Sequence, residues 1–340
     1  MLISVQSLRA LAAWVVVFHH FMQVFFNFEA HTPLEHLFAD RGAVGVDVFF
    51  VISGLVIFLA TVDKDLPPWR FMLYRLARIV PAYWFYTLLM ALLVIAVPPM
   101  FPNDHVVLGH LLKSLLFIPA QSPSGLGVLP LLDVGWTLNF EMLFYFLFAW
   151  TLLVRWPYRL LGVAALLFLV CYVGPSLGFI PVFYRSDIVL EFLMGIGIGM
   201  LYRRGCCQAR PCWALLGIVW ALLAIYYWPV SPRGVVWGVP SATLVLSCVT
   251  LEPYFNNSRL LKLIGDCSYS VYLIHMLVLS PGRWFAERYG IDPYAILPVC
   301  VVLTALAALG SYQWLEKRTY RSLKRRFSVG DQESLSRQNY

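Results

Sequence analysis

Two adjacent histidines, His19 and His20, interrupt an apolar stretch near the start of the chain, residues 7–21 (SLRALAAWVVVFHHF). His20 follows Arg9 with no charged residue between them. On a helix this separation lifts the imidazole roughly 16 Å, close to the middle of a hydrocarbon layer about 30 Å thick. Titratable groups at that depth are costly and usually functional. We therefore interpret His20 as a general base, since its ordinary pKa lies near neutrality. The alternative is a histidine hydrogen-bonded between helices, which we favour for His19.

Arg75 and Arg78 lie three residues apart in the segment YRLARIVPAYW, so they share one face of a helix. Arginine binds phosphate oxygens through two parallel N–H groups. The pair therefore suits a phosphate or pyrophosphate group at the cytoplasmic entrance of its helix. The alternative is a pair of arginines that sets membrane topology or contacts lipid headgroups.

A carboxylate and two other polar-capable side chains lie in the apolar segment VGWTLNFEMLFYF, namely Glu141, Trp136 and Asn139. Helical rise places Glu141 about 10 Å below the outer face. A glutamate within the membrane indicates function. We expect Glu141 to orient the ring of His20 or to compensate its transient positive charge, and Trp136 and Asn139 to contact substrate.

His275 lies near mid-depth in the segment CSYSVYLIHM, with Tyr272 beneath it on the same helical face. His275 fits a substrate contact and a hydrogen-bonded core histidine equally well.

Asp47 precedes the segment FFVISG, which contains Ser53. Asp47 could contact substrate, cap its helix or pair with Arg41. For Glu191, a salt bridge to Arg185 or to another loop arginine is the simpler interpretation.

The composition indicates an integral membrane protein. The 340 residues are 60% hydrophobic and 13% charged, with a mean hydropathy of +0.74, against about 25% charged in soluble domains. The net charge of +7 comes from short loops and the tail, which favours a role in topology over nucleic-acid binding. The seven cysteines lack the spacing of a zinc site, and we expect neither disulfides nor a metal. No cleavage site follows the first apolar run, so we expect that helix to be retained.

The apolar runs predict an all-α, polytopic membrane helix bundle over residues 1–320, followed by a basic, polar and disordered cytoplasmic tail over 321–340. Most of the 25 lysines and arginines fall on one side of this arrangement, which places both termini in the cytoplasm. The long connection 98–133 could cap an outward-facing cavity or be disordered. The ten predicted spanning helices cover residues 5–28, 42–62, 69–97, 134–154, 158–175, 186–202, 212–229, 234–251, 267–286 and 293–316.

The predicted depths bring the histidines and the glutamate together in the middle or outer half of the bilayer, while the arginine pair lies on the cytoplasmic side. A cavity joining the two levels could admit a phosphorylated donor from one face and an acceptor from the other. This arrangement predicts transfer of a group across the membrane.

Five motifs in one order resemble the acyltransferase-3 family of integral membrane acyltransferases, within it the bacterial branch that modifies exopolysaccharides. They extend over nearly the whole chain. The matching stretches are the Arg-x10-His motif from Arg9 to His20, FFVISG at 49–54, the Arg-x2-Arg motif of Arg75 and Arg78, W-T-L-x-x-E at 136–141, and SYSVYLIH at 268–275.

The resemblance implies acetyl-coenzyme A (acetyl-CoA), or a related acyl-CoA, as donor. It also implies a sugar hydroxyl of a surface polysaccharide or of its lipid-linked precursor as acceptor. The expected location is the bacterial inner membrane, in contact with lipid. His20 would be the catalytic histidine, Arg75 and Arg78 would hold the coenzyme phosphates, and we add Arg9 and Ser53 to the donor site. Many relatives carry a soluble periplasmic domain after the last helix. We expect this chain to hand the acyl group directly to its acceptor.

Three alternatives stay open at this point. His20 could act as a general base or carry the acyl group covalently. The group could be acetyl or succinyl. A proton-coupled transporter or a flippase of a lipid-linked sugar would also need polar groups within the membrane, although the arginine pair and the lack of a visible repeat favour the enzyme.

Overall fold

The computed structural model describes residues 2–64, 66–155, 158–208, 211–229, 231–255, 258–319 and 321. Within these ranges the chain is helical and contains no strand, apart from one isolated bridge between Gln121 and Val128. The predicted all-α fold is confirmed. The predicted disordered tail lies outside the described residues, except for Arg321.

Each of the ten predicted segments contains a helix, and three further short helices, α2, α5 and α13, lie between them. Segments of 3-10 or π helix continue or join several of these elements, among them η2 (Asp133–Gly135), η3 (Leu169–Val173) and η6 (Tyr312–Lys317). The α-helices are α1 (Ile3–Phe26), α2 (Pro33–Arg41), α3 (Val44–Thr61), α4 (Pro68–Ala96), α5 (Leu108–Leu115), α6 (Trp136–Thr151), α7 (Tyr158–Phe168), α8 (Gly174–Ser176), α9 (Val189–Arg203), α10 (Pro211–Tyr227), α11 (Arg233–Val236), α12 (Gly238–Thr250), α13 (Arg259–Asp266), α14 (Ser268–Tyr289) and α15 (Pro293–Ser311).

Among the described residues, six helical segments are long and apolar enough to cross a membrane, and the count is seven if α13 and α14, bent by 52° at their junction, form one span. The chain is therefore a multi-pass membrane protein. The expected number of ten spans is not confirmed. With 16, 15 and 17 residues, α6, α9 and α10 rise only about 23–26 Å, short of a hydrocarbon layer about 30 Å thick. The orientation of the termini stays a prediction.

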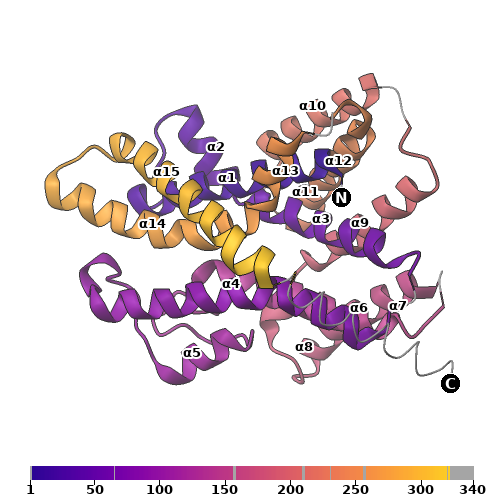
Figure 1. Ribbon diagram of the computed structural model, residues 1–340, viewed down its shortest axis with the longest axis horizontal. Coiled ribbons are helices and arrows are strands. Elements are labelled where there is room, and N and C mark those ends of the chain that lie inside the picture. The colour runs from indigo at the N-terminus through magenta and orange to yellow at the C-terminus, as the bar shows by residue number, and fades with distance from the viewer. Residues whose placement is uncertain are drawn as a thin grey trace.

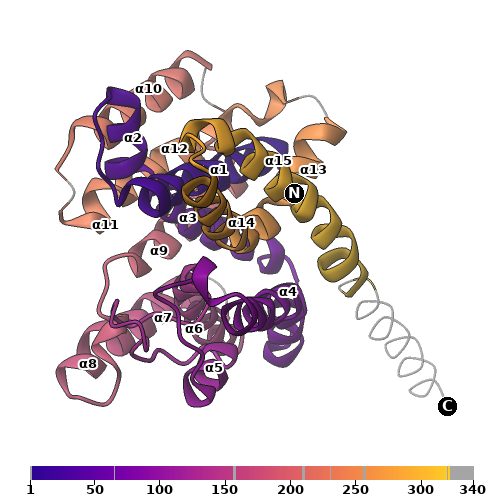
Figure 2. The same cartoon turned by 90° about the vertical axis from the view of Figure 1, so that its left-hand side faces the viewer.

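Helices α1, α3 and α14 lie at the centre of the bundle. Helix α3 packs most extensively against α9, and α14 packs against both α1 and α15. Helices α4 to α8 form a separate group below them in both views (Figures 1 and 2). Two segments far apart in the sequence, α1 and α14, therefore face α4 and α6 across the region that contains the candidate site.

The contact between α3 and α9 depends on glycines. A Cβ at Gly195 would overlap the carbonyl oxygen of Val51, and a Cβ at Gly54 would overlap that of Phe192. Gly197, one position off this face, has nothing within 4 Å of an added Cβ. The close contact between α3 and α9 thus requires a small residue at Gly195.

The long connection 98–133 packs against the side of α4. The hydroxyl of Tyr83 donates to the carbonyl of Ser114 at 3.0 Å, and the indole N–H of Trp84 donates to the carbonyl of Leu115 at 2.8 Å. These bonds anchor α5 to α4. No residue of this connection lines either cavity described below, so the expected role as a cap finds no support there.

We predict that Gly195→Ala destabilises the protein while Gly197→Ala does not. The first change forces a methyl group into the α3 backbone, an overpacking cost of about 1–3 kcal/mol. The second adds a methyl group in open space and gains about 0.5–1 kcal/mol of helix propensity. Thermal unfolding of the two purified variants in one detergent checks this. Equal melting temperatures would contradict the proposed packing.

Candidate active site

Two cavities meet inside the bundle. The inner cavity has a volume of about 80 Å³, and the wide cavity has a volume of about 1000 Å³. Both are lined by Val56, Arg75 and Arg78. The inner cavity holds only a handful of water molecules, so it suits an extended chain rather than a sugar ring. The wide cavity is at the upper end of the roughly 300–1,000 Å³ typical of ligand pockets.

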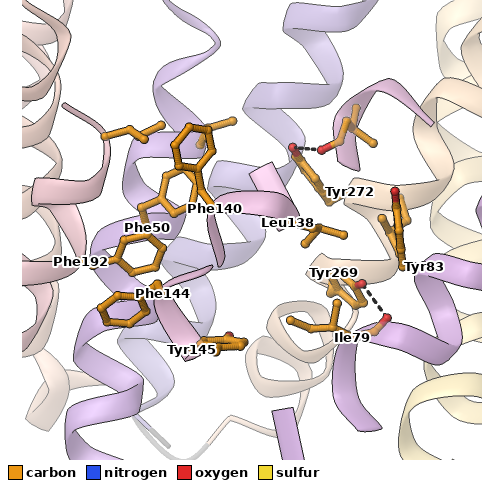
Figure 3. Packing of buried hydrophobic residues seen from close by; sticks show 14 of the residues in the cluster. Phe50, Ile79, Tyr83, Leu138, Phe140, Phe144, Tyr145, Phe192, Tyr269 and Tyr272 are labelled. Carbon is orange, nitrogen blue, oxygen red and sulfur yellow. Dashed lines mark hydrogen bonds between the residues drawn. The ribbon is translucent and has the colours of Figure 1, made fainter. Parts of the chain in front are cut away.

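Aromatic side chains of α3, α6 and α14 surround the inner cavity. The side chains that line it include four aromatic rings and one leucine: Phe50, Tyr145, Tyr269, Tyr272 and Leu138. Figure 3 shows these side chains. Two of the tyrosine hydroxyls are held by hydrogen bonds: that of Tyr269 donates to the carbonyl of Ile79, and that of Tyr272 lies 2.9 Å from the hydroxyl of Thr137. The wall is therefore built from fixed rings.

Arg75 and Arg78 lie on one face of α4, as their spacing predicts, at the junction of the two cavities. The guanidinium of Arg75 lies over the rings of Phe71 and Tyr145, with 5.3 and 5.4 Å to the ring centroids. Such stacking fixes the plane of a guanidinium.

Glu141 lines the inner cavity and is hydrogen-bonded to two hydroxyl groups. Its Oε1 accepts hydrogen bonds from Ser53, at 3.3 Å, and from Tyr145. It forms no hydrogen bond with His20 in the described structure. The expectation that Glu141 orients the His20 ring is therefore not what the geometry shows; its electrostatic partners are Arg9 and Tyr145.

Arg9 lines the same cavity and is 8% exposed. Its Nη1 donates to Oε1 of Gln6 at 3.4 Å, and Nε2 of Gln6 donates to Asp266 at 2.6 Å. This chain of contacts links α1 to the end of α13. The residues predicted to bind the acyl donor come from three separate motifs, and all of them line the inner cavity: Arg9, Ser53, Arg75 and Arg78.

His20 and His275 form a hydrogen-bonded pair. Nε2 of His275 lies 3.0 Å from Nδ1 of His20, and the two rings are 4.9 Å apart. His275 is fully buried and His20 is half-buried. The geometry brings together the two histidines that the sequence singles out, 255 residues apart.

The carbonyl partners of the two rings fix their tautomers. Nδ1 of His275 lies 3.2 Å from the carbonyl of Val271. Because a carbonyl only accepts, this nitrogen carries the proton in the neutral ring, and Nε2 of His275 is the acceptor. Nδ1 of His20, also 3.0 Å from the carbonyl of Val16, is then the donor. Nε2 of His20 keeps its lone pair and can take up a proton.

The histidine pair lies beside the inner cavity, outside its lining. Phe49 and Tyr272 line the cavity, and the ring of Tyr272 lies 6.0 Å from that of His275 and 5.9 Å from that of Phe49. His19 does not line the inner cavity. Its Nδ1 lies 2.9 Å from the carbonyl of Phe38, which fits the interpretation of His19 as a hydrogen-bonded structural histidine.

Asp47 is fully buried and pairs with Arg233. Nε and Nη2 of Arg233 donate to its two oxygens at 3.0 and 2.8 Å. The expected partner, Arg41, instead donates to the carbonyl of Trp228.

Glu191, also fully buried, interacts with Asp47 and Arg233. Among the described residues no salt bridge joins Glu191 to Arg185, so that partner and the Arg41 pairing are wrong, whereas Arg233 fits the other part of the prediction, another loop arginine near Glu191. Packing of α3, α9 and α11 decides these partners.

Trp136 and Asn139 lie on α6 but line neither cavity. Trp136 packs against Phe140 with ring centroids 6.0 Å apart. Asn139 is 3% exposed, and its side-chain oxygen has no hydrogen-bond partner among the described residues. Their predicted substrate contacts, like that of Asp47, stay predictions.

The wide cavity carries basic residues that the motif search missed. Sequence reasoning assigned them to topology, although the i, i+3 spacing of Arg259 and Lys262 matches that of the arginine pair. The acidic members of the lining are Asp266 and Glu316, and the additional basic members are Lys64, Arg70, Arg259, Lys262, Lys317 and Arg321. No group of metal-ligating side chains is found in the part of the chain that the structure describes.

Comparison with known proteins supplies a family. The family model described as an acyltransferase domain, acyltransferase-3, matches residues 2–312. No solved structure matches the chain significantly.

Three curated proteins resemble the chain over most of its length. Exopolysaccharide production protein ExoZ of Rhizobium meliloti (strain 1021) is 34% identical over 290 residues, covering 81% of this chain and 89% of that protein. Acyltransferase MdmB of Streptomyces mycarofaciens is 25% identical, covering 89% and 88%. The putative peptidoglycan O-acetyltransferase YrhL of Bacillus subtilis (strain 168) is 26% identical, covering 96% of this chain and 56% of that longer protein.

We predict that neutral His20 carries its proton on Nδ1 because His275 and the Val16 carbonyl both accept there. Nitrogen-15 NMR of histidine-labelled protein, with the His20 signals assigned by their loss in His20→Gln, measures this directly. His275→Leu should release a second population protonated on Nε2. A wild-type His20 already protonated on Nε2 at neutral pH would contradict the derived tautomer.

Proposed function

This chain belongs to the acyltransferase-3 family of membrane acyltransferases, and on that premise we propose that it acetylates a sugar hydroxyl. The proposed donor is cytoplasmic acetyl-CoA. The proposed acceptor is a surface polysaccharide or its lipid-linked precursor, and the proposed location is the bacterial inner membrane. The names of two relatives, an exopolysaccharide production protein and a putative peptidoglycan O-acetyltransferase, support a glycan acceptor. Family membership as an acyltransferase removes the transporter and flippase as leading alternatives.

The observation that carries this proposal is the position of Arg75 and Arg78. Both line the wide basic cavity and the narrow inner cavity. A coenzyme thioester matches these two cavities in size and charge, because it joins a bulky, highly charged nucleotide to a thin, uncharged arm. Pyrophosphate at the arginine pair would leave the nucleotide in the wide cavity and direct the arm inward.

In the proposed reaction, Nε2 of His20 takes the proton of the acceptor hydroxyl as its oxygen attacks the thioester carbonyl carbon. The carbon–sulfur bond then breaks, the acetyl group stays on the sugar oxygen, and the coenzyme leaves as a thiolate that takes up a proton. General-base assistance of this kind contributes about 10²–10⁴-fold in rate. His275 is a positioning residue, because its bond to Nδ1 aims the unprotonated nitrogen away from itself.

Glu141 acts from the cavity rather than on the imidazole. We assign it to balancing the positive charge of Arg9 and the arginine pair, where it is held by Ser53 and Tyr145. His20 and His275 do not line the inner cavity, whereas Tyr272, whose ring lies 6.0 Å from that of His275, does, so the thioester must move beyond this lining to reach His20.

We predict that His20→Ala and His20→Gln lower acetyl transfer by at least about 10²-fold, because the base is lost. Purified protein, labelled acetyl-CoA and the exopolysaccharide of the source cell provide the assay. His19→Gln is the matched control, since the hydrogen bond of His19 goes to the backbone carbonyl of Phe38, and it should retain transfer. Near-normal turnover by inserted His20→Ala protein would remove the histidine from the mechanism.

We also predict that replacing both Arg75 and Arg78 with alanine weakens coenzyme binding by about 10²–10⁴-fold, because two charge-assisted hydrogen bonds are lost and each is worth about 1.5–3 kcal/mol. Binding of the acceptor should change little. Calorimetry with CoA, beside the acceptor concentration that gives half-maximal transfer, separates the two. Unchanged affinity for CoA would refute the phosphate assignment.

A further inference from the structure

One wall of the wide cavity is the short helix α13, which directs two cations into it. Arg259 and Lys262 are exposed, line the cavity and lie one helical turn apart on a single face. The arginine pair of α4 lines the same cavity at its inner end, where it meets the inner cavity. The wide cavity therefore offers two pairs of cations at different distances from the inner cavity.

Helix α13 is rigidly attached to its surroundings. Gly265 lies against the backbone of Gln6, where an added Cβ would overlap the Gln6 carbonyl. Asp266 accepts hydrogen bonds from Gln6 at 2.6 Å and from Tyr312 at 3.0 Å. At the other end, the hydroxyl of Ser258 caps the helix by accepting from the N–H of Leu261. The exposed cations of α13 thus project from a fixed support.

Two of the other outer cations, Lys317 and Lys64, each follow an acidic residue that competes with a phosphate. Lys317 lies over the ring of Tyr312, 5.9 Å from its centroid, and its neighbour Glu316 lines the same wall. Lys64 follows Asp63, which is paired with Arg203. The pair on α13 combines an arginine, which binds phosphate oxygens bidentately, with a lysine, which adds a point charge.

We propose that Arg259 and Lys262 bind the 3′-phosphate on the ribose of coenzyme A, as a subsite separate from the arginine pair. The inference rests on the proposed function, which places the pyrophosphate at Arg75 and Arg78. Because the pyrophosphate lies between the pantetheine arm and the ribose, the 3′-phosphate must lie farther out, where α13 provides the cations. This subsite selects free acyl-CoA over acyl carriers that present only a phosphopantetheine arm.

The test compares CoA with dephospho-CoA, which lacks only the 3′-phosphate. Their affinities are measured by calorimetry for the full chain in nanodiscs of phosphatidylcholine, for wild type and for the double variant Arg259→Gln, Lys262→Gln. Wild type should bind CoA about tenfold more tightly than dephospho-CoA, the lower end of the range for hydrogen bonds to charged groups. The double variant should lose this difference by weakening CoA alone.

Arg318→Gln is the matched control. Arg318 is exposed, lies over the ring of Trp314 and is not part of the lining of the wide cavity. It should leave both affinities unchanged. Repeating the measurement with phosphatidylglycerol in the nanodisc distinguishes nucleotide from lipid: the difference between the two coenzymes should persist.

Three outcomes would overturn the assignment. Equal weakening of CoA and dephospho-CoA in the double variant would show a general electrostatic effect and would leave the acyl-CoA donor intact. Loss of the difference only when anionic lipid is present would assign the cations to a lipid headgroup. Wild-type protein that binds neither coenzyme would refute the subsite and the proposed donor together.

Discussion

Hydrocarbon offers no hydrogen bonds, so a polar side chain within this bundle is stabilised by a partner on another helix or on its own backbone. This constraint determines which helices lie together around the site. The bond between His20 and His275 joins α1 to α14, and the ion pair of Asp47 with Arg233 joins α3 to α11. The polar contacts that make chemistry possible are thus also contacts that order the helices, and changing one for function also changes the packing.

The interior is divided by size and charge in a way that no single helix provides. A narrow cavity walled by fixed aromatic rings opens at Arg75 and Arg78 into a wide cavity lined by cations from α4, α13 and η6. In the proposed binding mode the charge of the donor stays in the wide cavity, and only its uncharged arm enters the inner cavity, which Glu141 lines together with Arg9, Arg75 and Arg78. The cost of moving ions into a low-dielectric interior is then avoided for the donor, and Glu141 reduces it for the arginines.

The sequence was sufficient to locate the helices, because apolar runs and their breaks are local properties. It also identified the histidines and the arginine pair, since titratable groups are conspicuous in apolar segments. It could not supply partners. Asp47 and Arg233 are 186 residues apart, and nothing local selects Arg233 over Arg41. Helix α13 was missed because its eight residues are too few to span a membrane and its cations match a topology signal equally well.

The partner of His20 has a consequence for the chemistry. A carboxylate bonded to Nδ1 would place a permanent charge in a low-dielectric interior, and an unpaired buried charge is costly. A neutral imidazole fixes the same tautomer without that charge. It also gives Nδ1–H a route for its proton, since Nε2 of His275 faces it at 3.0 Å. When His20 takes a proton on Nε2, its positive charge can spread over two rings instead of one, so the pair can act as a base and still be neutral whenever no hydroxyl is reacting.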